Sequence, residues 1–332
     1  MDCLISFIIP AFNASETIIR CLESVFSLPL AEADYEVIVI DDHSADNTID
    51  IVSDCMKSHP CLHLLCQQEN HRQGAARNRG LSIAKGKFIA FIDSDDEADK
   101  GILPALQLGI QNRLDMVAMR VEKRSIDKQN VSYFELPFQP TAVFSGIELQ
   151  TSHPFWFTGP CAYLYSSDFL ASVAYPFEGD VLFEDSDFVN VHLYKADRMA
   201  YCKDCGYVIH ENPSSTTHTI SYKNVCEYAL LGTRLLNLYQ GIDVKDTPFA
   251  ESILEGGSYN IMRSFRNVFR LRDMKEVRQF YDRLDSRYDR SRLLGYRTPS
   301  YCWNAWTRFC LRHRVVATLI IACIIRIKSI FR

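Results

Sequence analysis

Three aspartates stand within four positions at the end of an apolar run of this 332-residue chain. The run is Phe88–Ile92, and Asp93, Asp95 and Asp96 follow it. Such closely spaced charges repel one another, and with no basic residue beside them the repulsion must be relieved by solvent or by a cation. Carboxylate oxygens suit Mg²⁺ or Mn²⁺, and Mg²⁺ is often held by one or two carboxylates together with substrate phosphates. The cluster can therefore be interpreted as a metal site or as a solvated acidic turn. A D-x-D element alone would favour the solvated turn.

A second acidic cluster, Glu184, Asp185 and Asp187, lies in the stretch F-E-D-S-D-F. Neighbouring carboxylates can raise the pKa of one of them toward neutrality, where it could act as a general base. The alternative is structural, because acidic side chains stabilise the first turn of a helix through the helix dipole. Val189 and Leu193, which follow, are spaced as on such a helix.

Strands and helices alternate over the first 120 residues and would position these side chains. Apolar runs of strand type stand at residues 4–10, 35–40, 62–66, 88–92 and 114–119. Runs without polar alternation are typical of a parallel sheet that helices cover on both faces. Ligands of such sheets bind beyond the carboxyl ends of the strands. The sequence places Asn13, Asp41, Asp42 and the first acidic cluster at these ends.

Composition and missing motifs exclude several function classes. With 47% hydrophobic and 23% charged residues, the chain is a folded globular protein. Neither G-x-G-x-x-G nor G-x-x-x-x-G-K-[ST] follows a strand, so we expect no glycine nest for phosphates. Nucleic acid is a poor partner, because acidic side chains outnumber basic ones in the chain before residue 290. The twelve cysteines are scattered and the chain opens without a basic, cleavable leader, so we expect reduced thiols and a cytoplasmic location.

Four motifs make the chain resemble glycosyltransferase family 2, in both order and spacing. They are S-F-I-I-P-A-F-N at 6–13, V-I-V-I-D-D-H-S-A-D-N-T at 37–48, N-H-R-Q-G-A-A-R-N-R-G-L-S-I-A-K-G at 70–86 and F-I-A-F-I-D-S-D-D at 88–96. The resemblance implies the α/β GT-A fold, a Rossmann-like, mostly parallel sheet flanked by helices, here with a helical C-terminal extension. It also implies an inverting transferase that uses a nucleotide sugar and Mg²⁺ or Mn²⁺.

The resemblance assigns part of the nucleotide pocket. Pro10, Ala11 and Asn13 would line it, and Asp42 would accept a hydrogen bond from the base, as expected for the N–H of uracil. At the next position the family often has Gly or Asn, whereas this chain has His43. We interpret this departure as a small change in the shape of the pocket.

The resemblance also implies roles on the diphosphate side. Arg77 is a candidate for contact with the nucleotide or diphosphate. Alternatively, it pairs with the acidic loop, which is the segment 93–96 that contains the first acidic cluster. Asp93, Ser94 and Asp95 form the D-x-D element, in which the two aspartates would hold the metal. His210 is a further candidate ligand, although a lone histidine is more often structural.

On the acceptor side, the resemblance makes Asp185 the general base that takes the proton of the acceptor hydroxyl, with Glu184 beside it. Residues 153–167 mix aromatic side chains with Gly and Pro and suit a loop that lines the acceptor site. Trp156 and Gly159 are the acceptor-side candidates in it.

The C-terminal tail differs in composition from the rest of the chain. Residues 290–332 contain nine Lys or Arg and no Asp or Glu. The apolar core of the tail, Val315–Ile325, is too short for a spanning helix, which needs about 20 residues. Basic flanks and aromatic ends favour a helix lying on an anionic membrane surface, against the alternative of a helix packed on protein.

We accordingly expect four regions: a nucleotide-sugar half at 1–120, an acceptor half at 121–220, a helical region at 221–305 and a membrane-associating tail at 306–332. The predicted function is transfer of a sugar, most simply from a UDP-sugar, to a glycan or lipid-linked acceptor in cell-surface polysaccharide synthesis at the inner face of the membrane. A sugar-phosphate nucleotidyltransferase and a catalytically silent scaffold are the alternatives. The former should carry a glycine-rich, basic signature after the first strand, which P-A-F-N-A-S lacks.

Overall fold

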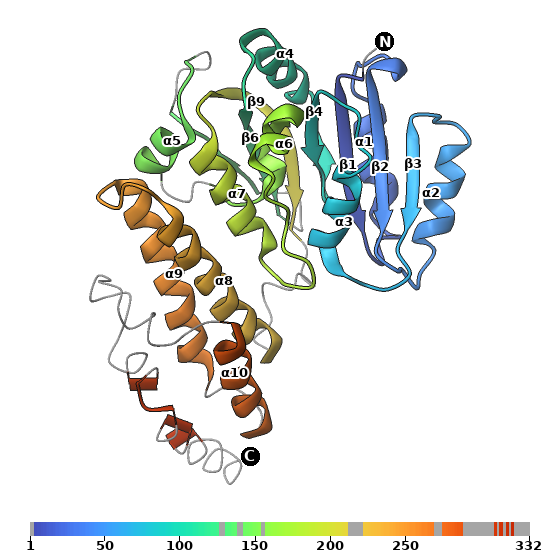
Figure 1. Ribbon diagram of the computed structural model, residues 1–332. Helices are drawn as coiled ribbons and strands as arrows, with labels where there is room; N and C mark the ends of the chain where they lie inside the picture. Colours follow the sequence, from blue (N-terminus) through green and yellow to red (C-terminus); the bar gives the residue numbers. More distant parts are fainter. Residues whose placement is uncertain are drawn as a thin grey trace. The chain divides into compact units, whose positions relative to one another are not determined.

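The structure is a computed structural model that describes residues 3–125, 130–137, 142–153, 157–211, 222–268 and 274–287, and residues 309–310, 312–314, 317–318 and 320–321 of the tail. The chain divides into two compact units, Met1–Pro213 and Ser214–Arg332. The first contains a sheet with helices and the second contains helices (Figure 1). The expected halves 1–120 and 121–220 share one sheet, so a division of function between them stays a prediction.

The strands described in the first unit form one sheet in the order β3-β2-β1-β4-β8-β6-β9-β5, and β7 pairs with β6. Their bounds are β1 Ile5–Ala11, β2 Tyr35–Asp41, β3 Leu62–Cys66, β4 Phe88–Phe91, β5 Glu97–Ala98, β6 Met116–Arg124, β7 Val131–Phe134, β8 Tyr163–Ser166 and β9 Met199–His210. Every residue of β1 and β2 is buried, as their continuous apolar sequences predict.

The two sides of the sheet differ in strand direction. Strands β3, β2, β1 and β4 are parallel, while β8 lies antiparallel between β4 and β6. The expectation of an α/β sheet with helices is confirmed. Part of the segment expected as a loop at 153–167 instead forms β8, because Tyr163 and Tyr165 pack into the core of the sheet. Four residues without a distinct period could not predict this strand.

Seven helices are described in the first unit: α1 Ile18–Phe26, α2 Thr48–Met56, α3 Arg72–Leu81, α4 Ile102–Asn112, α5 Gly146–Ser152, α6 Ser167–Val173 and α7 Glu184–Lys195. Helix α3 packs on β1 and β2, whereas α4 packs on β6, β8 and β9. Gly80 allows the close approach of α3, since a Cβ there would overlap the side chain of Ile8 on β1. Helix α3 is thereby held close against β1 and β2.

The second unit consists of α8 Tyr222–Gly241, α9 Pro248–Asn267, α10 Met274–Arg287 and the described tail residues. Cys310, Ala317 and Ile321 of the tail belong to the same buried apolar cluster as side chains of the three helices. Across the parts of the chain that are placed, no helix combines the length and hydrophobicity needed to cross a lipid bilayer.

Candidate active site

The loops after β1 and β2 are joined by hydrogen bonds at the carboxyl edge of the sheet. Ala11 and Asp41 are register partners at the ends of the two strands. The backbone N–H of Asn13 donates to Ser44 Oγ (2.9 Å), and Asn13 Oδ1 accepts from the backbone N–H of Ala45 (2.8 Å). Asn13, predicted to line the nucleotide pocket, therefore holds one loop against the other.

Both loops contain a residue with a left-handed backbone. The φ angle is 49° at Asn13 and 66° at His43. Residues other than Gly, Asn and Asp are disfavoured in this region. The geometry explains why Gly or Asn suits the position of His43. The side chain of His43 is exposed.

Asp42 is a buried carboxylate that joins the end of β2 to the segment between β3 and α3. It is 3% exposed, and its Oδ1 accepts from Gln67 Nε2 (2.7 Å) and from the backbone N–H of His71 (2.8 Å). Desolvation raises the pKa of Asp42, although the backbone hydrogen bond from His71 opposes the shift. The neighbouring Asp41 accepts from the backbone N–H of Ser44 and orients the loop.

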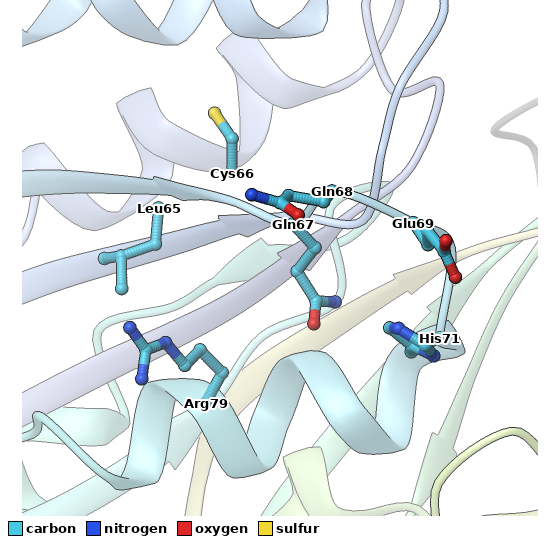
Figure 2. Close-up of a pocket in the computed structure, with 7 residues that line it drawn as sticks. All are labelled: Leu65, Cys66, Gln67, Gln68, Glu69, His71 and Arg79. Atoms are coloured by element: carbon cyan, nitrogen blue, oxygen red, sulfur yellow. The ribbon is translucent and has the colours of Figure 1, made fainter.

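A pocket of about 430 Å³ opens beside Asp42. Figure 2 shows Arg79 of α3 extending toward Leu65, while Cys66 points to the opposite side. The lining residues are Leu65, Cys66, Gln67, Gln68, Glu69, His71 and Arg79. Gln67 and His71 connect the pocket to Asp42, but neither acidic cluster lines it, so the pocket is not the reaction centre.

Arg77 connects the two acidic clusters. Its guanidinium lies 2.7 Å from Asp93 Oδ1 and 2.7 Å from Glu184 Oε1, and the side chain is 2% exposed. Burial disfavours the charge, but Asp93 and Glu184 more than compensate and raise the pKa of Arg77. The structure thus shows the pairing with the acidic loop that the sequence left as an alternative, and contact of Arg77 with a nucleotide stays a prediction.

Asp96 holds the acidic loop against β9. Its Oδ2 accepts from the hydroxyl of Tyr207 (2.6 Å) and its Oδ1 from the backbone N–H of His210 (2.8 Å). The same Tyr207 oxygen accepts from the backbone N–H of Asp93 (3.3 Å). Desolvation and the charges of Asp93 and Asp95 raise the pKa of Asp96 well above its usual value.

The structure does not gather the predicted metal ligands into a cluster. Within the described ranges, no group of three or more His, Cys, Asp or Glu side chains could hold an ion. His210 Nε2 lies 2.7 Å from Glu97 Oε1, which Arg20 also approaches. Desolvation and the Arg20 charge lower the pKa of His210, against the raising effect of Glu97. His210 thus contacts the side chain of Glu97, as the structural interpretation of a lone histidine allows.

Asp185, predicted to be the general base, has a raised pKa. It stands in the first turn of α7, directly after Phe183, whose φ of 61° directs the chain into the helix. Desolvation and the charge of Glu184 raise the pKa of Asp185 to about 7, although Arg77 and the backbone N–H of Ser186 oppose the shift. Glu184, an expected acceptor-side residue, is buried and bonded to Arg77.

The other predicted residues are Pro10, Ala11, Ser94, Gly159 and Trp156. Pro10 and Ala11 are buried in β1, and Ser94 is half-buried between the two aspartates. Gly159 precedes a short 3₁₀ helix, Pro160–Ala162, and Trp156 lies outside the described residues. Sequence reasoning missed Tyr207, and the apolar Y-V-I run around it signals only a buried strand.

Comparisons with known proteins agree with this arrangement. The sequence profile "Glycosyl transferase family 2" matches residues 6–170. The chain is 29% identical over 229 residues to the uncharacterized glycosyltransferase EpsJ of Bacillus subtilis, covering 66% of this chain and 64% of that protein. It is 37% identical over 144 residues to the Escherichia coli UDP-Glc:alpha-D-GlcNAc-diphosphoundecaprenol beta-1,3-glucosyltransferase WfaP, covering 43% and 51%. The chain thus spans less than two thirds of each relative.

A solved structure supports the fold. The crystal structure of residues 1–349 of S. aureus TarS in complex with UDP-GlcNAc aligns with a TM-score of 0.67 at 17% identity, covering 99% of this chain and 92% of that one. At this identity the likeness shows the fold alone. The profile match includes the residues that form the acidic loop and α3, and the fold agrees with it. The chain therefore belongs to glycosyltransferase family 2.

Proposed function

We propose that this protein transfers a sugar from a UDP-sugar, with inversion, to a hydroxyl of a glycan or lipid-linked acceptor in cell-surface polysaccharide synthesis. One observation carries the proposal. The buried Arg77 draws the acidic loop and the start of α7 together, so that Asp185, with a pKa of about 7, lies at the carboxyl edge of the sheet. Ligands of such sheets bind at that edge.

Asp185 is the general base of the proposed reaction. Its carboxylate takes the proton of the acceptor hydroxyl while the acceptor oxygen bonds to the anomeric carbon of the donor. The bond from that carbon to the diphosphate oxygen breaks, and the nucleoside diphosphate leaves with the bonding electrons. A base with a pKa near 7 is half ionised at neutral pH and still accepts a proton readily.

The loops after β1 and β2 would bind the nucleoside. Asn13 and Asp42 lie on these loops, which hydrogen bonds already hold in one arrangement. Such preorganisation lowers the ordering cost of binding. The UDP in the TarS complex and the UDP-Glc in the name of WfaP support uridine as the base.

The carboxylates of the acidic loop fit a divalent cation that arrives with the diphosphate. After desolvation, the negative charges of Asp93 and Asp95 contribute most to raising the pKa of Asp96, so carboxylate charge gathers on this loop. Because Asp93 Oδ1 already binds Arg77, we assign the metal chiefly to Asp95, with phosphate oxygens completing its coordination. When bound, Mg²⁺ or Mn²⁺ would stabilise charge on the leaving diphosphate.

A lipid-linked acceptor would place the protein at the inner face of the membrane. The diphosphoundecaprenol acceptor in the name of WfaP and the basic tail support this part of the proposal.

Isothermal titration tests the donor site. We expect one of UDP, GDP and dTDP, foremost UDP, to bind in the presence of Mn²⁺, and the binding to be lost in EDTA and in Asp95→Ala. Asp54→Ala, on the exposed end of α2, is the matched control and should bind normally. If wild-type protein binds none of the three nucleotides, the scaffold alternative replaces the transferase.

A further inference from the structure

The segment before the catalytic helix has an irregular backbone. Residues 174–183, here named the strap, connect α6 to α7 and lead directly into Glu184 and Asp185. Ala174, Asp180 and Phe183 have φ angles of 50°, 57° and 61°. Left-handed residues such as Ala174 and Phe183, which are neither Gly, Asn nor Asp, are strained and persist only where surrounding contacts hold them. The strap therefore needs contacts that fix it, and these also fix the position of Asp185.

Helix α3 supplies the main contact through Asn78. Its Nδ2 donates to the backbone oxygen of Phe177 (2.8 Å), and its Oδ1 accepts from the backbone N–H of the same residue (2.9 Å). One side-chain amide thus satisfies both polar groups of one strap residue, as a neighbouring strand would. No smaller or apolar side chain could replace both bonds.

Two further contacts join the strap to α3. A Cβ atom on Gly74 would overlap the backbone oxygen of Glu178 and would lie 2.9 Å from Cγ of Glu184. The strap therefore crosses the helix at a place where only glycine fits. At the start of the helix, the backbone N–H of Asp180 donates to the oxygen of His71 (3.3 Å).

The ring of Phe177 packs against α7 and so connects the strap to that helix. It stacks on Phe188 with centroids 3.7 Å apart and planes 8° apart, and it meets Phe91 of β4 edge-on at 5.3 Å. Phe188 is one helical turn beyond Asp185. A shift of Phe177 would therefore move the first turn of α7 as well, because closely packed rings cannot slide without a void.

We propose that Asn78 is a positioning residue for the general base: through Phe177 it sets where Asp185 stands relative to the donor. The proposal rests on the proposed function and adds a role for α3 that involves no contact with the nucleotide. Both side-chain hydrogen bonds described for Asn78 run to the strap, so its loss should misplace the base and leave the donor loops unchanged.

Hydrogen exchange tests the placement without any substrate. In Asn78→Ala and in Gly74→Ala, we expect faster exchange of backbone amides in residues 174–188, with unchanged exchange in β1 and β2 as an internal reference for folding. Asn112→Ala is the control for the amide, because the side-chain amide of Asn112 donates to the backbone oxygen of Leu108 in its own helix α4. Gly179→Ala is the control for the methyl group, because a Cβ there meets only Ala75 Cβ at 3.9 Å.

Kinetics supply the second readout. For Asn78→Ala we expect kcat to fall about tenfold to a hundredfold, the scale of a misplaced catalytic group, while the nucleotide affinity measured by titration stays unchanged. Unchanged exchange in the strap, or an equal loss in the two controls, would overturn the inference. A lower nucleotide affinity would do the same, since it would place Asn78 in the donor site. If the wild type transfers no sugar, the proposed function fails, and the exchange experiment still decides whether Asn78 holds the strap.

Discussion

At the scale of single residues, the burial of Arg77 decides which groups its charge can contact. An exposed arginine near the acidic loop could contact a diphosphate, but this guanidinium is 2% exposed and salt-bridged to Asp93 and Glu184. A buried charge that has lost its hydration must be paired. Arg77 therefore contributes to the site by pairing with two carboxylates and holding their segments together.

We predict that Arg77→Met destabilises the first unit by about 3–5 kcal/mol, the usual cost of leaving a buried carboxylate without its partner. Urea unfolding of the mutant and the wild type measures the difference. Lys57→Met is the control, because Lys57 pairs with Asp54 on the surface, where water screens the two charges and the pair adds little to stability. Equal effects of the two substitutions would contradict the structural role of Arg77.

The pKa of Asp185 leads to a prediction about rate. Because the base must be ionised, kcat/KM should rise about tenfold per pH unit below pH 7 and level off above it. Asp185→Asn should abolish transfer at every pH, whereas Asp50→Asn, on the exposed side of α2, should leave the profile unchanged. A profile without a change near pH 7 would argue against Asp185 as the base.

The same pKa predicts an effect on stability. Between the unfolded pKa of 3.8 and the folded pKa of about 7, the folded state binds more protons than the unfolded state. The contribution of Asp185 to the unfolding free energy is therefore present at low pH and is lost as the pH rises through this range. Asp185→Asn should raise the unfolding free energy relative to wild type more at pH 8 than at pH 5, as measured by urea unfolding. A gain of the same size at both pH values would contradict the shifted pKa.

At the scale of elements, β9 fixes the acidic loop. Strand β5, which directly follows the loop, pairs antiparallel with β9, so that Ala98 lies opposite Tyr207. From there Tyr207 reaches both Asp93 and Asp96. The third aspartate of the motif, Asp96, thus has a structural explanation: its hydrogen bonds to β9 hold the loop in place.

Tyr207→Phe should destabilise the first unit by about 1–3 kcal/mol, because it removes the partner of a buried carboxylate oxygen and of a backbone N–H. We also expect weaker nucleotide binding in the presence of Mn²⁺, since the loop would lose its fixed position. Thermal unfolding and titration measure the two effects. Tyr133→Phe, on the exposed edge strand β7, is the control and should be neutral. Full nucleotide affinity in Tyr207→Phe would argue against this role of the strand.

At the scale of the whole molecule, the tail belongs to the second unit. Cys310, Ala317 and Ile321 are fully buried in the cluster of α8, α9 and α10, and Arg314 pairs with Asp282 of α10. One face of the tail is therefore packed on protein, which the sequence analysis held as the alternative. The proposed membrane contact would use another face, on which Ile320 is 38% exposed.

Two substitutions at neighbouring positions distinguish packing of the tail on protein from its proposed membrane contact. Ile321→Asp should lower the melting temperature, because it puts an unpaired charge into the apolar cluster. Ile320→Asp should leave the melting temperature unchanged and weaken sedimentation with vesicles that contain anionic lipid. If Ile320→Asp binds vesicles as well as wild type does, the membrane contact of this face is refuted.

The parts of this protein that the sequence determined are those that depend on local order. Continuous apolar runs identified β1, β2 and β4, and because parallel strands end at one edge, Asp42, Asp93 and Asp95 could be assigned to that edge before any contact was known. The motifs likewise identified the family, and they singled out Asp185 in the first turn of its helix.

Only the tertiary structure decided which partners these residues have. Arg77 and Glu184 are 107 positions apart, Asn78 and Phe177 are 99 apart, and Tyr207 and Asp96 are 111 apart. Periodicity tells which face of an element is buried, but the contact between two such faces depends on strand order, and the antiparallel insertion of β8 has no local signal. The buried charge of Arg77 and the raised pKa of Asp185 arise from those contacts, because desolvation and nearby charge are properties of the folded packing and not of the chain.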